Sequence, residues 1–202
     1  MQNTKNIDHL EMLCPRKRLK KYSFPADFSI VCFDNSQQQK NALFSMWEER
    51  VGDEQEVNEA FQRRFLSQPD CKPEKDIIFI KHKNNYMGAL TAMYHKKEKL
   101  GHLHYVMLDA KFRGKRLSYP LLYVGMKKLH KDGALYVFLN TDDWRKSAIK
   151  LYLNYGFLPK IDTRDVERSA IHKKMWKAIY KNLGLKVLNM YDENKKVIQL
   201  AI

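Results

Sequence analysis

The turn Arg113–Ser118, which reads Arg-Gly-Lys-Arg-Leu-Ser, is the part of the chain best suited to binding an anion. It stands between a predicted buried strand, Leu103–Leu108, and a predicted helix, Leu117–His130. Glycine permits a tight turn, and the first N–H groups of a helix have no acceptor within the helix. Such a turn can bind the pyrophosphate of a nucleotide-like cofactor, and its basic side chains would add charge-assisted contacts. Basic turns with one glycine are common, so this motif alone leaves an ordinary surface turn equally open.

A second segment places a phenol on one face of an amphipathic helix. A predicted strand, Leu135–Leu139, precedes this helix. Positions i, i+3, i+4 and i+7 share the face and are occupied by Ala148, Leu151, Tyr152 and Tyr155. The face leads to Gly156, Phe157 and Pro159. On its own such a tyrosine is usually a packed aromatic, but beside a bound leaving group it is a candidate proton donor.

Together, the order and spacing of these two segments resemble the GNAT superfamily of N-acetyltransferases. In that family the pyrophosphate loop has the pattern Arg/Gln-x-x-Gly-x-Gly/Ala, and a later helix ends Ala-x-x-Leu-Tyr-x-x-x-Gly-Phe. The resemblance spans about Tyr86 to Pro159, and the later motif fits at every position. The loop departs from the pattern, because Arg116 stands where the family has glycine and Ser118 where it has a final Gly or Ala.

The resemblance implies direct transfer of an acetyl group from acetyl-CoA, the co-substrate, to a primary amine in a ternary complex. Backbone groups of the strand before the loop would hold the pantetheine arm, at Val106, Leu108 and Ala110. Backbone N–H groups of the loop would hold the pyrophosphate, at Arg113, Gly114, Lys115, Arg116, Leu117 and Ser118. Tyr152 matches the tyrosine that protonates the departing thiolate, and a phenol with a pKa near 10 suits a thiol with a pKa of about 8.5.

Two further features of the resemblance concern the region before the tyrosine. Arg145 occupies a position where many members have asparagine. We predict that Arg145 is one of the cofactor-binding residues. The sequence of Thr141–Arg145, followed by Ala148 and Ile149, is most similar to sequences of the mycothiol-synthase-like bacterial branch of the family. Trp176 in the terminal helix fits the same branch.

A general base is less clearly marked. Many family members have a glutamate on the strand before the loop. Here that strand has His102 and His104 on one face and Tyr105 and Asp109 on the other, if the side chains alternate. A histidine of near-neutral pKa can accept a proton from an ammonium substrate or its successor. We therefore predict His102 and His104 as catalytic residues, with ordinary half-buried side chains as the alternative.

The net charge of +14 leaves several partners open. A basic chain suits RNA, but 27 lysines against 10 arginines fit a general compositional bias, because the arginine fork is favoured in phosphate recognition. The favoured function is acetylation of a small-molecule or peptide amine. A second is acetylation of an RNA-borne amine, as on aminoacyl-tRNA, and a third is a non-catalytic CoA-binding module, which Arg116 and the missing carboxylate base would suit. A homodimer is also possible.

Hydrophobic periodicity supplies the elements that position these segments. Short apolar runs predict further strands, at Phe28–Phe33, Asp76–Lys81, Tyr86–Tyr94 and Leu100–Leu108. Amphipathic spacing predicts further helices, at Gln37–Val51, Val57–Leu66 and Asp165–Leu183. The tail predicts a hairpin of Lys186–Met190 with Val197–Leu200.

These elements predict an α/β fold. Early hairpins followed by a strand–helix–strand pattern imply a mixed, mostly antiparallel sheet of about six or seven strands with helices on both faces. The resemblance implies a V-shaped splay between the central strands near Leu108. The expected domains are an N-terminal extension (1–26), an acetyltransferase core (27–163) and a C-terminal helix plus hairpin packed on the core (164–202).

The composition and the apolar runs of the chain restrict the class of protein, its location and its metal content. The chain has 202 residues, of which 44% are hydrophobic, so global disorder is excluded. No apolar run approaches the roughly 20 residues of a membrane span, and the polar start Met1–Leu13 contains no signal-peptide segment, so we expect a cytoplasmic protein with no membrane partner. Cys14, Cys32 and Cys71 fit reduced thiols, and no spacing of metal ligands occurs, so we expect no metal.

Overall fold

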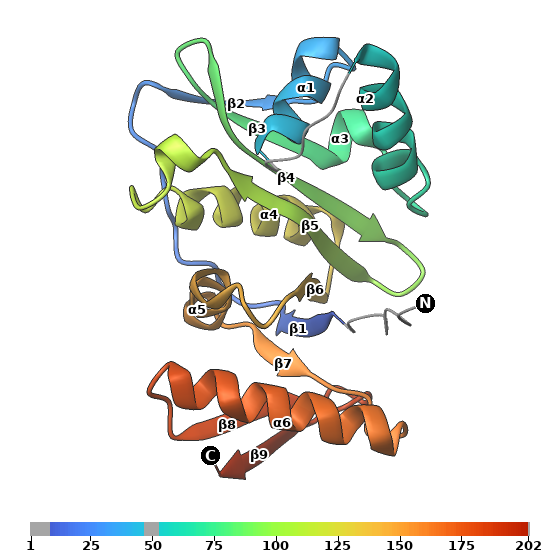
Figure 1. Ribbon diagram of the computed structural model, residues 1–202, viewed down its shortest axis with the longest axis vertical. Helices are drawn as coiled ribbons and strands as arrows, with labels where there is room; N and C mark the ends of the chain where they lie inside the picture. Colours follow the sequence, from blue (N-terminus) through green and yellow to red (C-terminus); the bar gives the residue numbers. More distant parts are fainter. Residues whose placement is uncertain (1–8, 47–52, 202) are drawn as a thin grey trace, which may run out of the picture. The chain divides into compact units, whose positions relative to one another are not determined.

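The computed structural model describes residues 9–46 and 53–201. The chain divides into two compact units, one formed by Arg16–Val137 and the other by Met1–Pro15 together with Phe138–Ile202. Figure 1 labels the helices and strands of both units. In the part of the chain that the structure describes, no helix combines the length and apolar character of a membrane span.

The described residues form nine strands in a mixed α/β fold, so the prediction of six or seven was wrong. The two additional strands are β1 (Leu10–Pro15) and β7 (Leu158–Lys160). The first follows a polar leader, and the second is only three residues long. The strand β7 is too short to give a hydrophobic pattern, and β1, although six residues long, directly follows the polar start of the chain and was assigned to an extension.

Four antiparallel strands form the sheet of the unit Arg16–Val137 (Figure 1). In spatial order they are β2 (Phe28–Cys32), β3 (Ile77–His82), β4 (Asn85–His95) and β5 (Leu100–Leu108). All four agree with the predicted strands. A tight turn at Lys83 and Asn84 joins β3 to β4, as the asparagine pair predicts.

One face of this sheet packs against three helical segments, namely α1 (Gln37–Met46), α2 (Glu54–Phe61) and the π-helix Gln62–Leu66. They share a buried cluster with the sheet that includes Phe44, Phe65, Phe79 and Ala89. The predicted helix Gln37–Val51 is therefore present up to Met46, and its last five residues lie outside the described ranges.

The opposite face of the sheet packs against α4 (Ser118–Asp132), which agrees with the predicted helix. Glycines allow the close approach: a Cβ atom on Gly125 would lie 2.7 Å from Leu103 and 2.9 Å from Leu90. Because neighbouring strand residues point to opposite faces, Leu90 faces α4 while Ala89 faces the three helical segments.

A β-bulge interrupts β5 and changes which residues share a face. Ala89 pairs with Met107 and Thr91 with His104, so two residues of β5 stand opposite one of β4. The first of the two, Tyr105, has a φ of 49°, in the left-handed region. Its ring lies 3.6 Å from that of His104 and 5.1 Å from that of Phe65, between centroids. The expectation that Tyr105 points away from His104 was wrong, because it assumed an unbroken alternation.

The other unit contains a second run of strands, in the order β6 (Tyr136–Thr141), β1, β7, β8 (Val187–Tyr191) and β9 (Val197–Ala201). The strand β6 begins two residues before the division between the units. The strand β1 pairs antiparallel with β7, and β8 pairs antiparallel with β9 in the predicted hairpin. The strands β7 and β8 are parallel, joined through α6 (Val166–Asn182), so the sheet is mixed.

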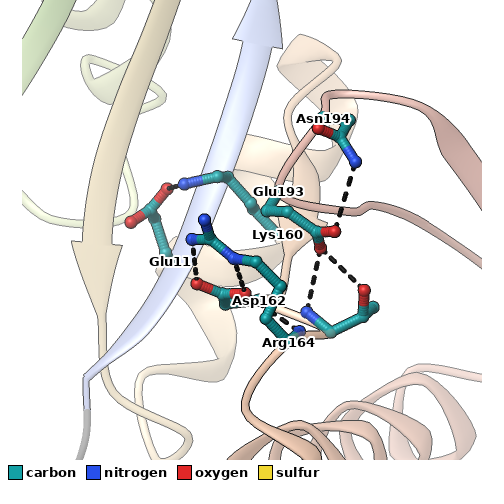
Figure 2. Close-up of polar contacts among 7 residues, drawn as sticks. Glu11, Lys160, Asp162, Arg164, Glu193 and Asn194 are labelled. Atoms are coloured by element: carbon teal, nitrogen blue, oxygen red, sulfur yellow. Dashed lines mark hydrogen bonds and ion pairs between the residues drawn. The ribbon is translucent and has the colours of Figure 1, made fainter.

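The strand β1 lies inside the segment predicted to be an extension. Leu10, Met12 and Cys14 are fully buried, and Lys160 of β7 forms an ion pair with Glu11 at 2.6 Å. In the same unit, the N–H and hydroxyl of Thr163 both donate to Glu193, at 3.0 and 2.7 Å (Figure 2). Residues 10–15 are therefore part of a sheet, a role that depends on pairing with a strand more than 140 residues away and that local sequence does not reveal.

Candidate active site

The predicted anion-binding turn connects β5 to α4 and combines two left-handed residues with an open helix start. A short 3-10 segment, Ala110–Phe112, follows β5. Gly114 then has a φ of 79° and Arg116 a φ of 59°. No side chain caps the start of α4, and its first turn contains no acidic residue. The positive end of the helix dipole is therefore not neutralised by a carboxylate from its own first turn.

The conformation of Arg116 explains why the family pattern has glycine at this position. Left-handed backbone brings Cβ too close to the neighbouring carbonyl, at a cost of roughly 1–2 kcal/mol for residues other than glycine. The backbone of the loop thus keeps the bend that glycine would adopt freely. The side chain of Arg116 is exposed, as is that of Lys115.

Two of the basic side chains of the loop have partners close by in the same unit. The Arg113 Nε atom donates to the carbonyl of Leu108 at 3.3 Å, and the Lys115 ammonium lies 5.0 Å from the centroid of the Phe112 ring. Arg113 thereby ties the loop to the end of β5, where Val106 and Leu108 were predicted to hold the pantetheine arm. Leu117 is buried and anchors the loop from its other end.

Tyr152 belongs to the other unit, on α5 (Lys146–Tyr155). The helix ends at Gly156, whose φ of 97° allows the N–H of Phe157 to reach the carbonyl of Tyr152 at 2.9 Å. The Phe157 ring is buried, with its centroid 5.9 Å from that of Tyr152. The Gly-Phe ending of the motif therefore closes the helix directly against the tyrosine.

Burial controls the protonation of this tyrosine. Tyr152 is 7% exposed, and burial raises its pKa to about 12, against a smaller opposing effect from Arg145. The phenol consequently keeps its proton throughout the physiological range, as a proton donor must. Arg145 itself forms an ion pair with Asp142 at 2.9 Å and lies over the exposed ring of Trp144 at 4.6 Å.

His102 and His104 lie together on β5, on the face that packs against the three helical segments. Burial lowers the pKa of His104 to about 4. Burial also lowers the pKa of His102 to about 3, with a further contribution from the charges of His104 and His95. Both rings are therefore neutral at pH 7 and able to accept a proton.

A threonine that sequence reasoning missed lies beside this pair. Thr91 of β4 is paired directly with His104. Its hydroxyl and the Nε2 atom of His104 are buried and have no hydrogen-bond partner among the described residues. Buried polar groups almost always have partners, so such a pair suits a site that receives a polar group from a ligand or from water. The pair belongs to the continuous register that runs from His95 opposite Leu100 to Thr91 opposite His104, and the bulge follows directly after it.

Residues 40–157 match the sequence model of the Acetyltransferase (GNAT) family, which is more than half of the chain. The chain belongs to the GNAT family. In this GNAT protein the match includes the loop Arg113–Ser118, both histidines and Tyr152. No curated protein matches the sequence.

Solved structures show the same fold at low sequence identity. A GCN5-related N-acetyltransferase from Sphaerobacter thermophilus aligns with a TM-score of 0.58 at 13% identity, over 75% of this chain and 48% of its own. A tandem GNAT protein from the clavulanic acid biosynthesis pathway aligns with a TM-score of 0.59 at 14% identity, over 75% and 50%. The ribosomal-protein-S18-alanine N-acetyltransferase of Escherichia coli gives 0.50 at 14%, over 64% and 76%. The aligned part thus spans about half the length of the first two structures.

The predicted site residues fall into both units. The loop, the end of β5 and the two histidines belong to Arg16–Val137, whereas Arg145 and Tyr152 belong to the other unit. Among the described residues, no group of three or more potential ligands could hold a metal ion. The sequence analysis did not identify Thr91 as part of this site, nor the hydrogen-bonded pair of His95 and Asp70 in the same unit.

Proposed function

We propose that this GNAT enzyme transfers an acetyl group directly from acetyl-CoA to the primary amine of a small molecule or peptide. The observation that carries the proposal is the loop before α4. Two left-handed residues, an uncapped helix start and exposed cations form a main-chain turn of the kind that binds a diphosphate.

The residues present fit acetyl-CoA. Main-chain N–H groups of Arg113–Ser118 would hold the pyrophosphate, with Arg145 as a further cationic contact. The backbone at Val106, Leu108 and Ala110 would hold the pantetheine arm, which calls for β5 to splay from its next neighbour near Leu108. Once bound, acetyl-CoA supplies an activated thioester.

Two side-chain roles complete the proposal. Tyr152 protonates the sulfur of the leaving group, and its pKa, raised by burial, makes it a weak acid that gives up its proton only as the thiolate forms. His104, with His102 beside it, accepts a proton from the amine nitrogen. A histidine of such low pKa is a weak base, so it acts as the N–C bond forms and the nitrogen becomes acidic.

The high positive charge favours a second candidate acceptor, the amine of an aminoacyl-tRNA. A third possibility is a CoA-binding module without catalysis, which Arg116 in place of glycine would suit. Membership of the mycothiol-synthase-like branch, the domain bounds 27–163 and 164–202, and a homodimer stay predictions.

Calorimetric titration with acetyl-CoA and with dephospho-CoA tests the donor site. We expect acetyl-CoA to bind, and no binding of either compound would remove the enzymatic function. Screening polyamines, amino acids, aminoglycosides and charged tRNA for acetylation then separates the two acceptor classes.

Replacing Tyr152 by Phe tests catalysis. We expect Tyr152→Phe to lower kcat about 100-fold, because it removes the proton donor, with acetyl-CoA binding unchanged. Tyr155→Phe is the matched control, since Tyr155 lies on the same helix and is equally buried. It should keep activity within a few-fold. Equal activity of the two variants would exclude Tyr152 as the acid.

A further inference from the structure

His95, at the end of β4, and Asp70, in the turn after the π-helix, have no role in the proposed function, yet they continue the line of the two catalytic histidines. We infer that His104, His102, His95 and Asp70 form a relay that carries the proton released by the acceptor amine out to solvent. The inference rests on the proposed acetyl transfer, with His104 as the base.

The relay follows one face of the β4–β5 pair. On β5, His104 and His102 are two residues apart, and their ring centroids lie 4.9 Å from each other. The next ring, of His95, is 6.2 Å from that of His102. The Nδ1 atom of His95 is 3.1 Å from the Oδ2 atom of Asp70. The proposed relay therefore includes bridging water between the nitrogens of neighbouring rings.

His104 is half-buried, exposure is lowest at His102, and from there it rises toward Asp70. His102 is 8% exposed, the side chain of His95 is 17% exposed, and that of Asp70 is 57% exposed. The carboxylate at the end can therefore exchange protons with water, which the buried His104 Nε2 atom cannot do directly. Asp70 has a φ of 65°, a left-handed conformation that aspartate tolerates better than most residues.

At the inner end, the surroundings of His104 suit a substrate nitrogen. The Nε2 atom of His104 and the hydroxyl of Thr91 are both buried without a partner among the described residues. The Tyr105 ring, turned to the same face by the bulge, lies between His104 and Phe65 of the π-helix.

The proton balance requires an exit of this kind. An ammonium acceptor has three N–H protons and the amide product has one. As the N–C bond forms and the C–S bond breaks, the nitrogen loses two protons. One of these protons replaces the proton that Tyr152 gives to the sulfur, and the other must reach solvent in each turnover.

Neutral imidazoles can carry that proton without accumulating charge. Each ring binds a proton on one nitrogen and releases the proton of the other, which leaves it neutral in the opposite tautomer. Burial lowers the pKa of both His104 and His102, so neither ring holds the proton as a stable imidazolium. A metal site is the other common use of clustered histidines, but these four side chains do not form a metal-binding group among the described residues.

The relay is tested by His95→Gln and Asp70→Asn in the full chain, assayed with acetyl-CoA and the acceptor found by screening. We expect kcat to fall about 10-fold in each, with the KM values of both substrates unchanged, because neither residue touches substrate. Adding imidazole buffer to about 100 mM should restore most of the lost rate, since a mobile base replaces the relay. A purely structural role would not respond to buffer.

The pair of His82, at the end of β3, and Asp27, just before β2, provides the matched control, because it is also a histidine–aspartate pair and lies outside the relay. Asp27→Asn should leave kcat and its buffer response unchanged. Unaltered kcat in both relay variants, losses that buffer does not restore, or equal losses in Asp27→Asn would overturn the relay while leaving the acetyl transfer in place. A wild-type chain that binds acetyl-CoA but acetylates no acceptor would overturn both.

Discussion

Arg116 shows how a departure from a family motif can leave the backbone unchanged. The residue adopts the left-handed conformation that the motif's glycine provides, and its side chain points into solvent. The loop therefore keeps its main-chain bend at the cost of local strain. Gly114 adopts the other left-handed conformation of the loop without this cost.

Arg116→Gly should raise the free energy of unfolding by up to about 1 kcal/mol, because it relieves strain that exceeds the entropy cost of a glycine. Lys115→Gly is the control, since Lys115 is not in the left-handed region. That change should lower the free energy of unfolding by about 0.5–1 kcal/mol. Urea unfolding of both variants measures the difference, and equal destabilisation would contradict the left-handed conformation of Arg116.

At the scale of elements, the site depends on two features of the sheet in Arg16–Val137. The bulge in β5 turns Tyr105 and Met107 toward the same face as His104. The helix α4 covers the other face and presents the anion-binding loop at its start. The position of α4, and with it that of the loop, depends on close packing against β4 and β5, which Gly125 permits.

Gly125→Val should therefore destabilise the protein by about 1–3 kcal/mol, because its side chain would overlap Leu103 and Leu90. The expected result is a lower midpoint in urea and weaker acetyl-CoA binding, since the loop moves with the helix. Lys127→Val, at an exposed position of the same helix, should cost less than about 1 kcal/mol. If the two variants unfold at the same urea concentration, the close contact of α4 with the sheet at Gly125 does not contribute to the stability of the protein.

At the scale of the whole molecule, the net charge of +14 raises the question of whether the acceptor is a small-molecule or peptide amine or an amine carried on RNA. The salt dependence of binding distinguishes the two. Attraction to RNA through scattered lysines is a counterion-release effect and weakens steeply with salt. Main-chain N–H groups that bind a diphosphate depend less on ionic strength, because their donors are fixed in a loop.

We expect charged tRNA to bind weakly, with an affinity that falls at least 100-fold between 50 and 200 mM salt, on the order given by several phosphate contacts. Acetyl-CoA affinity should change much less over the same range. Fluorescence anisotropy for tRNA and calorimetry for acetyl-CoA provide the comparison. Tight tRNA binding at 200 mM salt would instead favour an RNA-borne acceptor.

Much of the fold could be predicted because the signals for it lie in short stretches of the sequence. Seven of the strands, the helices α4 and α6 and the Gly-Phe ending of α5 follow from periodicity, and the family follows from two short motifs. Each of these signals lies within about 20 residues, the length over which hydrophobic spacing and turn chemistry are determined.

What the tertiary structure alone decided involves segments far apart in the sequence. The pairing of β1 with β7, the bulge that turns Tyr105, and the approach of Asp70 to His95 all depend on register between separate segments. The hydrophobic pattern along a strand is the same for every register, so the sequence by itself predicts where the strands lie but neither which partner each residue meets nor where a bulge breaks the alternation.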